Sequence, residues 1–200
     1  MKLAIRMMAA GALVAAGGCS VGGLLGGGAK APSTLQTLTP EALDPGAGTR
    51  TAAAGQSMTI AVPAVAKELR TVRVPVQVTP TDVQYVTNLQ WVDTPDRLFQ
   101  QLVAETVRRT TGRVVLDSNL TTVDPGLLLS GQLQKFGYDS ASGQVVVEYD
   151  GALSIAVGNR IETRRFVATA PSDGTAASVG PALNRAANQV AREVAGWIGG

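Results

Sequence analysis

The chain has 200 residues, of which 17 are basic and 15 acidic, with no histidine and a single cysteine. The basic excess is confined to the N-terminus: removal of residues 1–18 takes away Lys2 and Arg6 and leaves 15 residues of each sign. Nothing in this balance suggests binding to nucleic acid, which would need a basic patch or stripe. Because the chain has no histidine, it lacks the commonest general base and metal ligand. A single cysteine cannot form an internal disulfide.

Residues 1–18 have the layout of a secretory signal peptide. Lys2 and Arg6 flank the start of an apolar stretch, roughly Leu3 to Ala16, and small residues then lead to Cys19. This ending resembles a bacterial lipobox, in which the cysteine is acylated and the chain is cut before it, although Ala16 stands where leucine is usual. We expect Cys19 to be the lipidation site. The alternatives are an ordinary signal peptide with an incidental cysteine, or an N-terminal membrane anchor.

Residues 19–55 are expected to form the acylated N-terminus and a flexible tether. They are rich in glycine and small residues and contain Pro32, Pro40 and Pro45, a composition that buries too little apolar surface to order itself. Part of this stretch, around Leu35 to Leu43, could still dock on the domain that follows. No later segment has 18 uninterrupted apolar residues, so we expect the mature chain to be attached to a membrane rather than inserted in it.

Residues 56–200 are expected to form one domain, which opens with short extended segments. Met58 to Val62 predicts a strand that ends at a proline. Alternating apolar and polar residues from Leu69 to Val78 predict a half-buried strand, with Pro75 at an edge or a bulge. Val83 to Val86 predicts a further extended segment.

The first long helix has clear end signals. Thr94 is the expected N-cap, Pro95 occupies the first helical position and Gly112 stops the helix. Its expected apolar face consists of Leu98, Phe99, Leu102, Val103 and Val107. A strand from Arg113 to Asp117 and a loop from Asn119 to Gly126 are expected to follow.

The next forty residues predict a β-meander of three strands, followed by a closing helix. The strands are expected over 127–138, 145–157 and 161–169, with a turn at 139–143 and a tight turn at Gly158-Asn159. A loop then leads to a helix over 181–198, with Asn184, Asn188 and Arg192 on its polar side. The order of elements predicts an α+β domain with a mainly antiparallel sheet and two long helices packed on it.

The sequence offers no catalytic, cofactor or metal site. Asp93 and Asp96 flank a helix start, where capping and the helix dipole explain them. Glu148 and Asp150 share the expected solvent face of a strand and are interpreted as surface charges. The Arg108-Arg109 and Arg164-Arg165 pairs are interpreted as solvated, with contact to lipid headgroups or a partner as the alternative. Trp91 and Trp197 are expected in the core. We expect a protein without enzymatic activity and without a cofactor.

Several weak motifs, in a fixed order, resemble the ABC-type transport auxiliary lipoproteins, the family that includes PqiC-like components. After Cys19 and a linker come Ile60-Ala61-Val62-Pro63, Leu69 to Val74, and Gln90 to Pro95 with its tryptophan before the first long helix. The helix beginning Leu98-Phe99, the segments 131–136 and 164–166 of the meander, and the Ala-rich final helix complete the resemblance. The family often has a Tyr-x-Leu-x-Pro-like element after the tether, of which residues 35–40 keep at best a remnant.

The resemblance implies a non-catalytic, periplasm-facing lipoprotein that works with an MCE-type substrate-binding protein, an inner-membrane permease and an ATPase. Together they would move phospholipids or other hydrophobic molecules between the two membranes. Ser20 follows the acylated cysteine in place of the aspartate that retains lipoproteins in the inner membrane, which implies an outer-membrane anchor. A homo-oligomer is also plausible for the family. The alternatives are an assembly factor or plug for an outer-membrane barrel, and a periplasmic lipid-binding shuttle.

Overall fold

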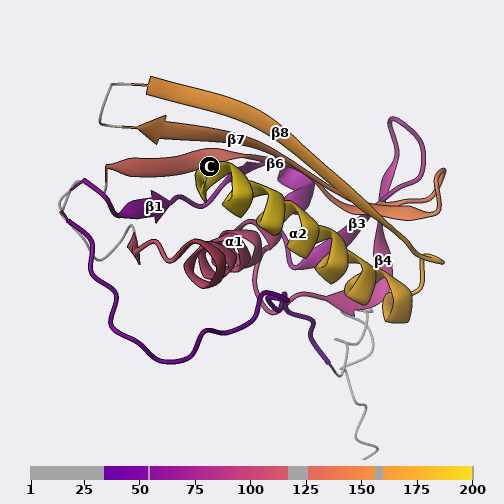
Figure 1. Cartoon of the computed structure of the whole chain (residues 1–200). Helices are drawn as coiled ribbons and strands as arrows, with labels where there is room; N and C mark the ends of the chain where they lie inside the picture. Colours follow the sequence, from indigo (N-terminus) through magenta and orange to yellow (C-terminus); the bar gives the residue numbers. More distant parts are fainter. Residues whose placement is uncertain (1–33, 54, 117–125, 156–159, 200) are drawn as a thin grey trace, which may run out of the picture. The chain divides into compact units, whose positions relative to one another are not determined.

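The computed structural model describes residues 34–53, 55–116, 126–155 and 160–199 (Figure 1). Cys19, the expected signal peptide, most of the expected loop over 119–126 and the expected turn at Gly158-Asn159 lie outside these residues. The elements are β1 (Met58–Ile60), β2 (Ala64–Val65), the 3-10 helix η2 (Lys67–Leu69), β3 (Arg73–Gln77), β4 (Val83–Gln90), α1 (Pro95–Thr111), β5 (Val115–Leu116), β6 (Leu127–Asp139), β7 (Gln144–Ile155), β8 (Arg160–Pro171) and α2 (Ala176–Gly199).

The sheet is organised around β6. One edge of β6 pairs with β7 in antiparallel register, and β7 pairs with β8 in the same way. Three short strands follow one another along the rest of β6, all parallel to it: β1 pairs with residues 127–129, β2 with 132–133 and β3 with 138–139. A single long strand therefore holds both the meander and the N-terminal strands.

The expectation of a mainly antiparallel sheet is wrong, because the sheet is mixed. Among the described residues, four of the seven strand pairings are parallel, and β3–β4, β6–β7 and β7–β8 are antiparallel. The error has a physical cause. Hairpin turns reveal antiparallel neighbours in the sequence, whereas parallel partners need a crossover connection and leave no local signal.

A bulge and a glycine in β6 shape the inner face of the sheet. The register shifts between Leu133 and Lys135, so Leu133 and Phe136 both point inward although they are three residues apart. Gly131 has φ +156°, and a Cβ there would lie 2.1 Å from the backbone oxygen of Asp150 and 2.8 Å from the hydroxyl oxygen of Tyr149. The missing side chain leaves room for Tyr149, whose hydroxyl donates to the Ser130 carbonyl at 2.9 Å.

The ends of α1 lie where the sequence predicts them. Pro95 begins the helix, and Gly112 follows it in the left-handed conformation with φ +67°, which glycine adopts without strain. Thr94 occupies the N-cap position with extended backbone, but its side chain makes no capping hydrogen bond. Instead its own N–H donates to Asp93 Oδ1 at 2.7 Å.

The final helix is longer than expected, since α2 begins at Ala176 rather than at Pro181. Just before the helix, the Asp173 carboxylate accepts hydrogen bonds from the N–H and the hydroxyl of Thr175 at 2.9 and 2.7 Å and so stabilises the turn that leads into it. The carbonyl of Thr175 then accepts from the N–H groups of Ser178 and Val179. Pro181 lies inside the helix, where it lacks the N–H that would bond to the preceding turn.

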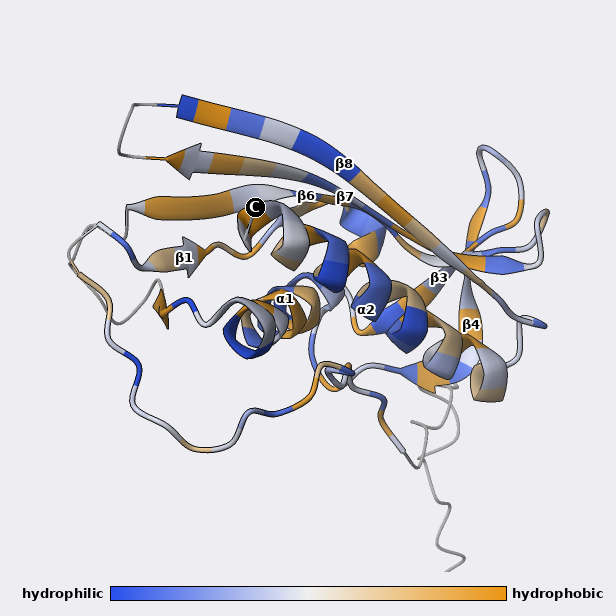
Figure 2. Ribbon diagram, in the orientation of Figure 1, coloured by the Kyte–Doolittle hydropathy of each residue, from blue (hydrophilic) through white to orange (hydrophobic). Residues whose placement is uncertain are grey.

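Both helices lie on the same face of the sheet, and their hydrophobic sides face the sheet and each other (Figures 1 and 2). Aromatic rings pack together in the core: Trp91, next to β4, contacts Phe136 of β6 with centroids 5.7 Å apart, and Phe99 of α1 contacts Tyr149 of β7 at 5.1 Å. Trp91 is fully buried, as expected. Trp197 is partly buried against Phe166, and its Nε1 donates to Glu162 at 3.2 Å.

Candidate functional site

The stretch expected as a tether, residues 19–55, is described from residue 34 onward, and much of it lies against the helices. We call residues 36–50 the strap. Gln36 joins the sheet through a parallel bridge to Trp91: its N–H donates to the Gln90 carbonyl at 2.8 Å, and its carbonyl accepts from Val92 at 2.9 Å. From there the strap runs over the polar sides of α2 and α1. The docking considered for Leu35 to Leu43 is therefore present over much of that stretch.

Two asparagines of α2 bind the strap backbone on both sides of Pro40. Asn184 Oδ1 accepts from the Thr39 N–H at 2.8 Å. Asn188 Oδ1 accepts from the Glu41 N–H at 2.8 Å, while its Nδ2 donates to the Thr39 carbonyl at 2.9 Å. One amide group thus satisfies a backbone donor and a backbone acceptor together, so Asn188 recognises main chain rather than side chains.

Side chains reinforce this docking at a few points. Arg192 Nη1 donates to Glu41 Oε2 at 2.8 Å, although both side chains are substantially exposed. Leu38 packs against the hydrophobic core. Gly180 of α2 lets the strap approach closely, because a Cβ there would lie 3.1 Å from Gln36 Oε1.

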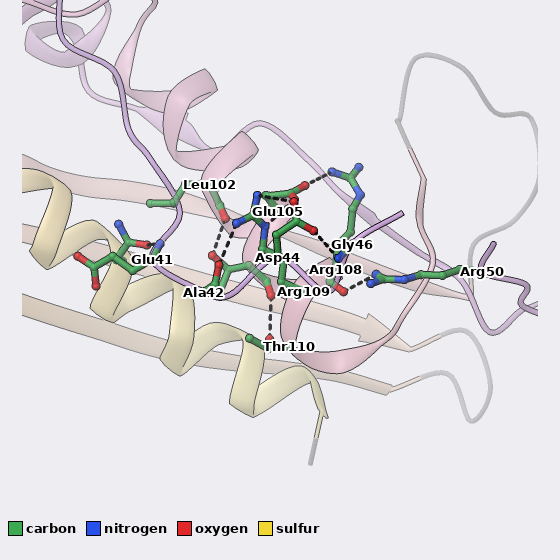
Figure 3. Close-up of polar contacts among 12 residues, drawn as sticks. Glu41, Ala42, Asp44, Gly46, Arg50, Leu102, Glu105, Arg108, Arg109 and Thr110 are labelled. Atoms are coloured by element: carbon green, nitrogen blue, oxygen red, sulfur yellow. Dashed lines mark hydrogen bonds and ion pairs between the residues drawn. The ribbon is translucent and has the colours of Figure 1, made fainter. Parts of the chain in front are cut away.

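The second part of the strap lies on the last turns of α1, around Arg109 (Figure 3). Arg109 Nε donates to Glu105 Oε1 at 2.7 Å, and its Nη1 donates to the Ala42 carbonyl at 2.9 Å. Its Nη2 lies 3.9 Å from Asp44 Oδ2. One guanidinium therefore connects the helix to the strap through three partners, and Arg50 adds a hydrogen bond to the Arg108 carbonyl.

The charges of this cluster hold Arg109 in place on α1. The hydrogen bond from Arg109 lowers the pKa of Glu105, and the charge of Arg109 and the neighbouring Arg108 act in the same direction. Glu105 is therefore ionised at neutral pH and holds the Arg109 guanidinium in place. Both arginines lie in the last turn of α1, where cations also interact favourably with the helix dipole.

The expectation that the polar residues of the two helices lie in solvent is wrong for Asn188 and Arg109. Asn188 is 1% exposed and the Arg109 side chain 20% exposed. Both lie on the polar side of their helix, as expected, but the strap covers that side. No local pattern reveals such a contact, because Glu41 and Asn188 are 147 residues apart in sequence. The only available signal was the group of three polar residues at helical spacing, Asn184, Asn188 and Arg192.

A second polar cluster lies on the opposite face of the sheet, where Glu148 and Asp150 share one side of β7 as expected, although the Glu148 side chain is only 13% exposed. Arg165 of β8 binds Asp150 with two hydrogen bonds, Nε to Oδ1 at 2.6 Å and Nη2 to Oδ2 at 2.7 Å. It also lies 3.2 Å from Glu148, which contacts Lys135 at 3.3 Å. The hydrogen bond from Arg165 lowers the pKa of Asp150. These groups neutralise one another, which is typical of a structural ion-pair network rather than an acid–base pair.

An open hollow of about 1520 Å³ lies near the C-terminal ends of α1 and α2. It combines apolar residues with basic ones; among those that line it are Leu127, Leu153, Ile155, Trp197 and Ile198, and the arginines Arg113, Arg160, Arg164 and Arg192. Arg160 pairs with Glu162 at 2.6 Å, and Arg113 donates to the Ile198 carbonyl at 3.1 Å. Arg164 lies over the Phe166 ring at 5.2 Å. Basic groups therefore outnumber acidic ones around an apolar floor.

Among the residues that the structure describes, no group of three or more Asp, Glu, His or Cys side chains is placed to hold a metal ion. Within the same residues, neither helix has the length and apolarity needed to cross a bilayer.

Comparison with known proteins identifies the fold and the family. Residues 37–195 match the family model of the ABC-type transport auxiliary lipoprotein component. The crystal structure of protein XCC0632 from Xanthomonas campestris has a TM-score of 0.64 with 20% identity, over 85% of this chain and 94% of that one. A crystal structure of an uncharacterized protein has a TM-score of 0.60 with 16% identity, over 75% and 96% of the two chains. No curated protein matches the sequence.

Proposed function

Because the chain belongs to the ABC-type transport auxiliary lipoprotein family, we propose that it is a non-catalytic, lipid-anchored subunit of an MCE-type transport system. Its partners are an MCE-type substrate-binding protein, an inner-membrane permease and an ATPase. The cargo consists of phospholipids or other hydrophobic molecules that pass between the inner and outer membranes. The partner ATPase hydrolyses ATP, and this chain has a docking role in the assembly.

Cys19 carries the acyl anchor in this proposal, after removal of residues 1–18. The Gly-rich stretch that follows acts as a spacer, and the domain faces the periplasm. Ser20 directs the lipoprotein to the outer membrane, because the inner-membrane retention signal is an aspartate at that position. One folded domain on a lipid anchor suits a component that connects a membrane to a transporter.

The observation that carries the proposal is the extent of the family match. It begins at residue 37, within the strap, and runs to residue 195, near the end of α2. The match therefore covers nearly all of the described fold, including the docked part of the chain that leads to the proposed anchor.

The decisive experiment is a crosslinking pull-down of the full-length protein from its native envelope, with proteins and lipids identified by mass spectrometry. We expect an MCE-type protein, its permease and its ATPase, together with a diacyl or triacyl mass on Cys19. The Cys19→Ser variant is the matched control, and it should lose both the acyl mass and the membrane fraction. Recovery of an outer-membrane barrel without a transporter would instead support the role of an assembly factor.

A second candidate function, a periplasmic lipid shuttle, draws on the hollow near the ends of the helices. Its apolar floor and its surplus of arginines fit an anionic amphiphile better than a neutral polar ligand. The same pull-down separates the two candidates. Stoichiometric lipid bound to the domain, without transporter subunits, would favour the shuttle.

A further inference from the structure

The strap lies on the surface of the helices and contributes little to the core. Of its apolar side chains Leu38 packs against the core, whereas Leu43 is 90% exposed. Nothing lies within 4 Å of the positions where a Cβ would stand on Gly46 or Gly48. Its attachment depends on the bridge at Gln36, on the packing of Leu38, on the hydrogen bond from Arg50 to the Arg108 carbonyl, and on polar contacts to four side chains: Asn184, Asn188, Arg192 and Arg109.

The domain can keep its core when the strap detaches. Apart from the bridge at Gln36, the strap supplies no strand of the sheet, and the hydrophobic sides of α1 and α2 are buried against the sheet and each other. Detachment mainly exposes amide and guanidinium groups, which water solvates well. Opening a segment of this kind costs far less free energy than opening a core strand or helix, because little apolar surface is exposed.

The strap also lies directly between the proposed anchor and the core. Gln36 lies 17 positions after Cys19, and Met58, which begins the first strand, lies 39 positions after it. Tension applied at Cys19 reaches Gln36 first, then Thr39 and Glu41, so the contacts are loaded one after another. Contacts that are pulled one after another break one at a time, and each breaks at a lower force than a group of contacts that share the load.

We propose that the strap can detach from the helices and so lengthen the tether between Cys19 and the domain. Under tension from the anchor it detaches from α1 and α2 while the rest of the domain stays folded, and it rebinds when the tension ends. At roughly 3.5 Å per extended residue, the maximal reach from Cys19 to the domain grows from about 60 Å to about 135 Å. The use of this reach at a membrane rests on the proposed lipidation of Cys19, whereas the detachment itself does not.

Force spectroscopy on the full chain tests the proposal. One handle is attached to the free thiol of Cys19 in unlipidated protein and the other to a Thr163→Cys substitution on exposed β8, so that the strap is loaded before the sheet and α2 lies outside the force path. We expect a first, reversible step with a contour-length gain of at most about 75 Å, which is 22 residues, before the domain unfolds.

Two variants identify the step. Asn188→Ala should lower its force, and Gln189→Ala, which replaces an exposed neighbour bonded to Glu193, should leave it unchanged. A first step much longer than about 75 Å, or a single unfolding event without a preceding step, would overturn the proposal. Because the measurement uses the free thiol, it is independent of acylation; failure of the anchor proposal is detected separately, by the mass of Cys19 in protein from the native envelope.

Discussion

Replacement of Asn188 by alanine should loosen the strap and leave the sheet intact. The substitution removes two hydrogen bonds to the strap, from the Glu41 N–H at 2.8 Å and to the Thr39 carbonyl at 2.9 Å. It also removes a bond from Nδ2 to the Asn184 carbonyl within the helix. No core side chain loses a partner, so the change acts on the docking of the strap.

The size of the effect follows from these bonds. At about 1 kcal/mol net for each bond to the strap, the free energy of strap opening falls by about 2 kcal/mol, which increases the open fraction roughly 30-fold. Global stability falls by less, about 1.5 kcal/mol, because alanine has a helix propensity higher than asparagine by about 0.5 kcal/mol. The helix is present whether the strap is open or closed, so this propensity gain does not affect local opening.

Amide hydrogen exchange measures the two quantities separately. The Thr39 N–H donates to Asn184, which the substitution leaves in place, so its exchange rate reports strap opening and should rise about 30-fold. The Ala61 N–H donates to Leu129 in the sheet and should follow only the smaller change in global stability. In the control Gln189→Ala both rates should stay at the wild-type values. If Thr39 and Ala61 change by the same factor in Asn188→Ala, the strap does not open independently and the reasoning is wrong.

Three further predictions concern the sheet and the charges. Gly131→Ala should destabilise the domain by at least about 2 kcal/mol in urea unfolding, because its Cβ would overlap Asp150 and Tyr149. The control Gly196→Ala, in an open position on α2, should stabilise the domain by about 0.5–1 kcal/mol. Equal effects of the two substitutions would refute the role given to Gly131. Arg165→Met should shift the midpoint of urea unfolding only slightly, since the Arg165 side chain is 60% exposed, and a large shift would show that the network supports the fold. The free energy of unfolding should fall as the pH decreases below about 4.5. In the folded chain the pKa of Glu105 is lowered from 4.5, and the pKa values of Asp139, Asp150 and Asp173 are lowered from 3.8, so the unfolded chain binds these protons first. A flat stability profile from about pH 6 downward would contradict this sign.

The elements with strong local signals could be predicted from the sequence. Pro95 and Gly112 mark the ends of α1, and the alternation of buried and partly buried residues along β7 follows the expected period of two. The expectation that the closing helix begins at Pro181 is wrong, because proline is typical of the first helical position but here lies inside the helix. The capping group formed by Asp173 and Thr175 upstream is the signal that identifies the true start.

The remaining errors concern contacts between distant parts of the chain. β1, β2 and β5 have two or three residues each, too few to show a period. β1 and β2 pair with β6, and β5 pairs with β1, so their partners are set by strands distant in sequence. The strap presents a similar case. A Pro-containing stretch without apolar periodicity predicts a linker, and its docking becomes visible only when Asn188 and Arg109 are brought beside it by the fold.

The way in which the strap is held has a consequence for its evolution. Asn184, Asn188 and Arg109 bind the main-chain atoms of Thr39, Glu41 and Ala42, which every residue type except proline can offer. Selection therefore acts on the helices that bind rather than on the segment that is bound. Relatives should keep hydrogen-bonding side chains at the positions of Asn188 and Arg109 while the sequence of the strap drifts, so the same path over the helices can persist in proteins whose N-terminal sequences no longer align.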